Sequence, residues 1–108
     1  MHWHPNSDEW QYYLGGKARV RIFGAHGRMF TEEFDRGKVG FIKQGFGHYV
    51  ENIGNEPLRF LAMFNTPNFQ EISITSWLSS NPAGMIADNL GLSRSVVDKM
   101  PREPLPIL

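Results

Sequence analysis

Residues 1–16, MHWHPNSDEWQYYLGG, are the stretch that decides the fold of this chain. His2 and His4 alternate within it, and alternate residues of an extended segment project to the same side. Residues 5–7 (PNS) predict a bend, and Glu9 then opens the aromatic-rich segment EWQYYL, which is typical of a strand. The pattern therefore predicts two short extended segments, with a carboxylate returning toward two imidazoles.

Short strand-like segments separated by glycine-containing turns continue from this start. The predicted strands cover residues 9–14, 17–23, 28–34, 39–42, 48–52, 58–64 and 70–77. Arg19 and Arg21 share one face of the second of these, which we interpret as a solvated face that pairs with Glu32 or Glu33. Aromatic side chains on these strands are interpreted as barrel core or interface. Several short strands at close spacing predict an antiparallel barrel or sandwich.

The pattern changes in the last quarter of the chain. The asparagine–proline pair at 81–82 predicts the start of a helix, and Gly91 predicts its end. Ser93 is a candidate cap for a second short helix, and a proline-rich tail follows. We therefore expect a β unit over residues 1–78, with a helical appendage and an extended tail over residues 79–108 in the same domain.

Composition excludes several classes of function. The chain has 108 residues, a formal net charge of zero and no cysteine, so disulfides, thiolate metal sites and cysteine nucleophiles are excluded. No basic stripe indicates a nucleic-acid partner, and no apolar run approaches the roughly 18 residues of a membrane span. The N-terminus lacks the pattern of a signal peptide, so we expect a cytoplasmic protein, or a secreted one if the gene begins upstream.

A third imidazole completes a candidate metal site. His48 stands at the head of the predicted strand HYVEN, after the turn GFG. With His2, His4 and Glu9 it would leave two positions of an octahedron open, which suits manganese or iron(II), while nickel, copper and zinc remain compatible with these ligands. The alternative is a frayed terminal His-x-His and a satisfied core histidine. His26, in a Gly-Ala-His-Gly turn, is interpreted as an exposed bystander.

The spacing of these residues resembles the two-part motif of the cupin superfamily. The first part, His-x-His-x4-Glu-x6-Gly, ends at Gly16. The second, Gly-x5-Pro-x-Gly-x2-His-x3-Asn, runs from Gly37 to Asn52, with Lys43 in place of the usual proline. The resemblance implies a mainly β double-stranded β-helix, or jelly-roll barrel. We expect it to lack its first strands and to carry a short C-terminal helical appendage.

A narrower resemblance covers nearly the whole chain. The segments MHWHPNSDEWQYYLGGKARV, GHYVENIGNEPLRFLAMF, SWLSSNP and DNLGLSRSVVDKM are similar to the C-terminal cupin of bicupin oxalate decarboxylases. These enzymes convert oxalate to formate and carbon dioxide, with dioxygen as a redox participant and manganese in each cupin. The resemblance implies Mn2+ at His2, His4, Glu9 and His48, and oxalate or another small carboxylate as substrate. It also implies dioxygen as co-reactant, and a companion cupin domain or a homo-oligomer as partner.

The catalytic acid or base is not identified by this resemblance. The family carries an acidic residue at the position of Ala62, and an arginine just before the Met-His-Trp-His segment, where this sequence starts. Glu71 is the remaining candidate, and a surface carboxylate is its other interpretation. We therefore predict an oxalate decarboxylase-like lyase that is part of a two-cupin enzyme or an assembling single cupin. The alternatives are a noncatalytic metal-binding or assembly module, and a different cupin oxidase or dioxygenase.

The first two ligands need anchoring from elsewhere in the protein. His2 and His4 stand at the start of the sequence, and termini that nothing holds fray. Metal ligands also depend on neighbours that orient them. We therefore expect a partner subunit, a swapped strand or the rest of a longer protein to cover this edge of the sheet.

Overall fold

The computed structural model describes residues 1–103 and divides into two compact units. The first unit comprises Met1–Glu71, and the second begins at Ile72. The predicted division after residue 78, and the assignment of both parts to one domain, stay predictions.

Seven strands make up the first unit. They are β1 (His2–Trp3), β2 (Glu9–Gly15), β3 (Ala18–Phe23), β4 (Met29–Phe34), β5 (Val39–Ile42), β6 (Gly47–Asn52) and β7 (Arg59–Phe64), with the single 3-10 turn η1 (Ala25–Gly27) between β3 and β4. From β2 to β7, every predicted strand is confirmed to within one residue at each end. Alternating side chains and glycine turns were therefore sufficient to locate these strands.

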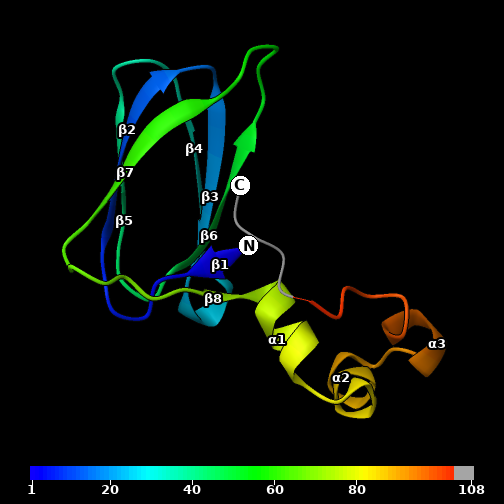
Figure 1. The fold of residues 1–108 in the computed structure, drawn as a ribbon. Helices are drawn as coiled ribbons and strands as arrows, with labels where there is room; N and C mark the ends of the chain where they lie inside the picture. Colours follow the sequence, from blue (N-terminus) through cyan, green and yellow to red (C-terminus); the bar gives the residue numbers. More distant parts are fainter. Residues whose placement is uncertain (104–108) are drawn as a thin grey trace. The chain divides into compact units, whose positions relative to one another are not determined.

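These strands form two antiparallel sheets. Within this unit, one sheet has the order β4-β3-β6-β1, and the other has the order β5-β2-β7. The three strands of the second sheet, β2, β5 and β7, are grouped at the left of Figure 1. The central strand β2 pairs Trp10 with Phe41 of β5 and with Met63 of β7. The mainly β fold predicted from the sequence is confirmed.

The apolar core lies between the two sheets. Tyr13 of β2 is fully buried there, together with Ala18, Val20 and Ile42 from neighbouring strands. Phe34 stacks on the Tyr13 ring at a centroid distance of 4.9 Å. The same inward face of β2 also carries the buried polar side chains Glu9 and Gln11, so the interior is apolar toward one end and polar toward the other.

Gly16 ends β2 in a conformation that explains why the sequence has glycine there. Its φ of +78° lies in the left-handed region that side chains other than glycine rarely adopt. A Cβ at this position would also lie 2.8 Å from the Leu58 Cα and 2.9 Å from the Pro57 carbonyl oxygen. The turn between β2 and β3 therefore requires glycine for both conformation and space.

The second unit corrects one prediction. Residues 70–77 were expected to form a strand, but only β8 (Ile72–Ser73) is extended, and α1 (Ile74–Ser80) follows at once. Ser73 causes the change because its hydroxyl accepts a hydrogen bond from the Ser76 amide, while the Ser76 hydroxyl accepts one from the Ser73 amide. This reciprocal cap satisfies two free helix-end donors and outweighs the strand preference of the β-branched residues.

Both predicted helices are present in the second unit. They are α2 (Ala83–Leu90), which ends at Gly91 in the left-handed conformation, and α3 (Arg94–Val97), which follows Ser93. Ile86 and Val97 are fully buried and pack with Ala83 and Ala87. No helix in residues 1–103 is long and apolar enough to span a membrane. The part of the predicted extended tail at residues 104–108 lies outside the described residues.

Candidate metal centre

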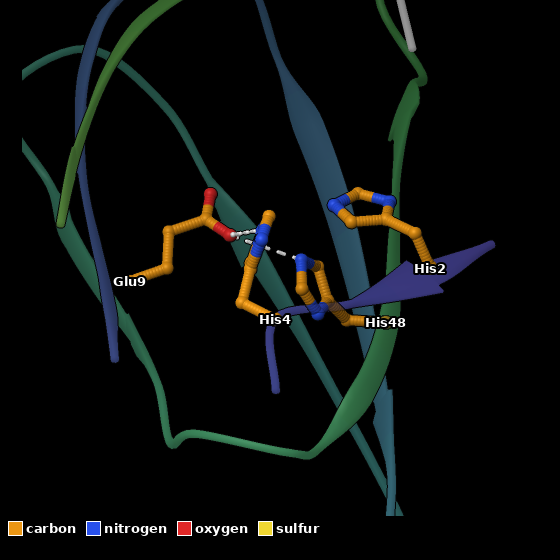
Figure 2. Close-up of side chains that lie close together, drawn as sticks. All are labelled: His2, His4, Glu9 and His48. Atoms are coloured by element: carbon orange, nitrogen blue, oxygen red, sulfur yellow. Dashed lines mark ion pairs between the residues drawn. The ribbon is translucent and has the colours of Figure 1, made fainter. Parts of the chain in front are cut away.

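Four side chains predicted as metal ligands lie together in the first unit. His2 comes from β1, His4 from the segment after it, Glu9 from the start of β2 and His48 from β6. One potential ligand atom from each lies within 4.8 Å of the others (Figure 2). His4, Glu9 and His48 are buried, whereas His2 is half-buried. The cluster therefore has one side that solvent reaches.

The two sheets bring these residues together. His2 and His48 are direct antiparallel partners in the β1–β6 pair. Glu9 belongs to the other sheet, where it pairs with Ile42 of β5 and with Phe64 of β7. The carboxylate therefore reaches the imidazoles across the interior, between the two layers.

Backbone carbonyls set the tautomer of two imidazoles. His4 Nδ1 lies 2.9 Å from the Gln70 carbonyl oxygen, and His48 Nδ1 lies 3.0 Å from the Phe46 carbonyl oxygen. A carbonyl oxygen can only accept, so each Nδ1 donates its N–H. In the neutral imidazole, each Nε2 then carries a lone pair that is directed into the cluster.

The acceptor atoms at the centre of the cluster lack a donor among residues 1–103. Glu9 Oε2 lies 3.1 Å from His4 Nε2 and 3.0 Å from His48 Nε2. Among the described residues, neither Glu9 Oε2 nor His48 Nε2 has a hydrogen-bond partner. A proton on each Nε2 would turn the contacts into ion pairs, and a metal ion would replace those protons. Buried acceptors that converge without a donor fit a cation, and imidazole with carboxylate suits a divalent transition metal.

Burial and charge favour the metal-binding forms of the ligands. Burial, together with the neighbouring His48 and His4, lowers the pKa of His2 to about 4. His2 is therefore neutral in mildly acid solution, which is the form that binds a metal. For Glu9 the largest influence, burial, acts to raise the pKa, but contacts with His48 and Gln11 prevail and hold the pKa below its ordinary value.

The N-terminal segment is held by segments distant in sequence. The Gly45 amide donates to the His4 carbonyl oxygen at 2.9 Å. The Asn6 side chain donates to the Asn68 carbonyl oxygen and accepts from the Gln70 amide. In large part, therefore, segments of this chain anchor residues 2–6, a source of support that was not predicted from the sequence.

A second set of contacts fixes the bend before Glu9. The Asn65 side-chain oxygen accepts from the Ser7 hydroxyl at 2.8 Å and from the Asp8 amide at 3.0 Å. The Gln44 amide donates to Asp8 Oδ1 at 2.8 Å. We call residues 65–70 the clasp loop, because its side chains and carbonyls hold residues 4–8. These residues were not predicted as part of the site, and their asparagine-rich, turn-forming composition is the only sequence signal for them.

The remaining candidates lie outside the cluster. Ala62 of β7 pairs with Gln11 of β2, so it faces the same interior side, yet it is exposed. This side of the sheet is therefore open to solvent beside β7. Glu71 is exposed and is not part of the metal-ligand cluster found among the described residues. His26 is exposed in η1 with a φ of 62°, as expected for a bystander.

Comparisons with known proteins agree with this arrangement. Residues 1–98 match the Cupin family. Oxalate decarboxylase OxdC of Bacillus subtilis (strain 168) is 40% identical over 108 residues, which is 100% of this chain and 28% of that protein. An oxalate decarboxylase of Arthroderma benhamiae is 30% identical over 104 residues, which is 95% of this chain and 24% of that protein.

Solved structures of oxalate decarboxylases are also similar to this chain. The formate complex of Lactobacillus farciminis oxalate decarboxylase superposes with a TM-score of 0.88 at 42% identity, covering 93% of this chain and 30% of that one. A structure of Bacillus subtilis oxalate decarboxylase, whose Mn(II) centres were studied by EPR, gives a TM-score of 0.91 at 41% identity and covers 97% of this chain and 28% of that one. The chain thus spans less than a third of these relatives. Its fold, its His/Glu cluster and these matches establish that the chain belongs to the cupin family.

Proposed function

We propose that this chain is a manganese-binding cupin domain that converts oxalate to formate and carbon dioxide as part of a two-cupin or assembled enzyme. The observation that carries the proposal is the convergence of three imidazoles and one carboxylate, with two buried central acceptors that have no donor among the described residues. His2, His4, Glu9 and His48 are the proposed ligands. Relatives of the oxalate decarboxylase type, one with Mn(II) centres and one solved with formate, support this metal and substrate class.

The site residues have defined tasks in this proposal. Carbonyl contacts at Nδ1 orient His4 and His48 so that Nε2 is directed inward. A bound divalent metal would supply charge stabilisation and orient the substrate carboxylates. The half-buried edge at His2 and the open side beside Ala62 give a small dianion access to the cluster.

The proton is the difficult part of the reaction. Oxalate dianion and one proton give formate and carbon dioxide, so a group of the protein or solvent must deliver a proton to carbon. Ala62 faces the site side of the sheet but cannot move a proton, and Glu71 lies outside the cluster. This observation favours the second candidate function, a noncatalytic metal-binding module that stabilises an assembly.

Formate release is the measurement that separates the two functions. The manganese-loaded chain is incubated with oxalate in air at mildly acid pH, and formate and hydrogen peroxide are both measured. The double variant Glu9→Ala/His48→Ala is the control. Formate that disappears in the control supports the decarboxylase, whereas peroxide without formate indicates a cupin oxidase.

A substitution at position 62 sharpens the test. Ala62→Glu places a carboxylate on the same side of the sheet as Glu9 and Gln11. If the wild-type chain releases no formate but the Ala62→Glu variant does, the wild-type chain lacks only the acid. If manganese is bound and neither protein releases formate, decarboxylation by this chain alone is contradicted and the noncatalytic function remains.

The proposal includes a partner that covers the sheet β5-β2-β7. Its outward residues are large, apolar and exposed, and we call them the outer apolar face: Trp10, Tyr12, Val39, Phe41, Leu61 and Met63. They form two rows across the three strands, with Trp10 and Tyr12 in the middle. Contiguous exposed apolar residues are typical of protein–protein contacts, which supports a homo-oligomer or a companion cupin domain.

A further inference from the structure

A chain of hydrogen bonds runs along the inward side of β2, away from the metal cluster. Tyr13 Oη donates to Gln11 Oε1 at 2.6 Å, and Gln11 Nε2 donates to Glu9 Oε1 at 2.8 Å. The three residues are at most 4% exposed. They alternate on one strand and therefore share one face. We call this set the β2 relay.

Tyr13 determines which way the Gln11 amide points. A carboxamide has one accepting end and one donating end, so a donor at its oxygen directs its NH2 group to the other side. Burial, with a smaller contribution from the Glu9 charge, raises the pKa of the Tyr13 hydroxyl, so it stays a donor. Its ring is fixed by Phe34, which is stacked on it, and by Phe60 at 5.3 Å.

The relay divides the two oxygens of Glu9 between different tasks. Oε1 accepts from Gln11, whereas Oε2 points to His4 and His48 and has no hydrogen-bond donor among residues 1–103. A carboxylate free on both sides could turn and offer both oxygens to a metal. With Oε1 held, Glu9 offers one oxygen in a fixed direction.

The neighbours of Gln11 leave room for this arrangement. Gly40 on β5 and Ala62 on β7 are its direct partners across the sheet. A Cβ at Gly40 would lie 3.2 Å from Gln11 Oε1 and 3.4 Å from the Phe34 ring. An alanine at position 40 would therefore press on the amide without removing any hydrogen-bonding group.

We propose that Gln11 is a positioning residue that holds Glu9 as a single-oxygen metal ligand, and that Tyr13 fixes the orientation of its amide. The inference rests on the proposed metal site, and it connects that site to the apolar core through Tyr13. Neither residue touches the metal ligands' imidazoles in this role. Both act through Glu9.

The test measures Mn2+ affinity of the full chain by chelator competition at constant pH. Gln11→Met keeps the length of the side chain and removes the amide, so we expect Mn2+ affinity to fall about 10- to 100-fold, the range typical of partners behind a metal ligand. Tyr13→Phe should lower it by roughly tenfold, the lower end of that range. Tyr12→Phe is the matched control because it makes the same change on the outward side of the same strand, and its affinity should stay within about twofold of wild type.

The Mn(II) EPR spectrum provides a readout that a loss of stability would not move. We expect Gln11→Met and Tyr13→Phe to change the spectrum of the bound ion, and Tyr12→Phe to leave it unchanged. If Gln11→Met does not fold, Tyr13→Phe and Gly40→Ala are measured in its place. Gly40→Ala is suitable because it keeps every hydrogen-bond donor and acceptor. Folded variants with unchanged affinity and spectrum would overturn the relay, while leaving the metal site intact. A wild-type chain that binds no Mn2+ would instead overturn the proposed function, and with it the role of the relay.

Discussion

The two sides of β2 reverse the usual pattern of a sheet. Its inward side carries Glu9 and Gln11, which are buried and polar, ahead of Tyr13 in the core. Its outward side carries Trp10 and Tyr12, which are 46% and 39% exposed. Antiparallel sheets ordinarily bury apolar residues and expose polar ones. The reversal shows that the interior near Glu9 serves a polar site, and it leaves a large apolar surface on the outside.

The other sheet provides the contrast. Two outward residues of β3, Arg19 and Arg21, are charged, and Arg19 forms ion pairs with Glu33 at 3.2 Å and with Glu51 at 3.4 Å. The predicted pairing of this strand with Glu33 is therefore confirmed. One sheet presents an ordinary solvated face, and the other presents the outer apolar face, so the two faces should respond differently to substitution.

The largest effect should come from the inward polar side. In His48→Ala we expect Mn2+ affinity to fall by more than the roughly 100-fold that loss of a residue behind a ligand can cost. The wild type should gain about 2.7 kcal/mol of stability at an Mn2+ concentration 100 times its dissociation constant, and at the same concentration the variant should gain less than about 0.4 kcal/mol. Thermal unfolding with and without Mn2+ measures both, and His26→Ala is the control because His26 is exposed outside the cluster. A retained stabilisation in His48→Ala would contradict the site.

The inward and outward sides of β5 allow a matched pair. Ile42 is 3% exposed in the core, whereas its neighbour Phe41 is 45% exposed. We expect Ile42→Ala to lower the free energy of unfolding by about 2–5 kcal/mol, because a cavity replaces packed methyl groups. Phe41→Ala should cost only about 0.5 kcal/mol in dilute solution. Urea unfolding of both variants checks this. Equal losses in the free energy of unfolding would show that the outward side is covered within the single chain.

The outer apolar face should govern association. The double variant Trp10→Thr/Phe41→Thr removes the aromatic pair whose rings lie 4.6 Å apart. Because each buried aromatic contributes about 1.5–3 kcal/mol, we expect self-association to weaken by at least roughly tenfold, with Mn2+ affinity unchanged. Sedimentation across a concentration series measures this, with Arg21→Thr on the charged face as control. A wild type that stays monomeric throughout would exclude the homo-oligomer and favour a companion domain.

The smallest effect belongs to the charged face. Contacts with Lys17, and then with Arg19, lower the pKa of Glu33, which is exposed. A lowered pKa adds stability that is present above the ordinary value of 4.5 and is lost as the pH falls through the folded-state value. Glu33→Gln should therefore slightly reduce stability at neutral pH and flatten the loss of stability in acid. Urea unfolding from pH 7 to pH 3 tests this, and a difference that survives high salt would argue against exposed charges as its cause.

The sequence was most informative where spacing alone determines position. Alternation placed Glu9 on one side of β2, and the motif ending at Asn52 placed His48 on its strand. Hydrophobicity did not say which side of β2 is inside, because Trp10 and Tyr12 are more apolar than the buried Glu9 and Gln11 beside them. The helix α1 was missed because Ile72, Ile74 and Thr75 favour strands, while the cap that starts the helix is a serine pair and not the usual serine–glutamate pair.

The supports of the site were beyond prediction from spacing. Asn6 and Asn65 look like ordinary turn residues in the sequence, yet they join segments far apart in the chain. Gln11 was named only as part of a strand, although its position two residues after Glu9 places it on the same side. Such contacts depend on how the sheets meet, which no local pattern records.

The clasp loop has a consequence for the order of events in folding. The contacts that hold His4 and Asn6 bridge separations of 66 and 64 residues, to Gln70 in both cases. Pairings between such distant residues carry a larger loop-closure entropy than local ones, so we expect them to form after the strands between them. We therefore expect the imidazole of His4 to acquire its final orientation late in folding, and metal uptake at full affinity to require residue 70 to be in place.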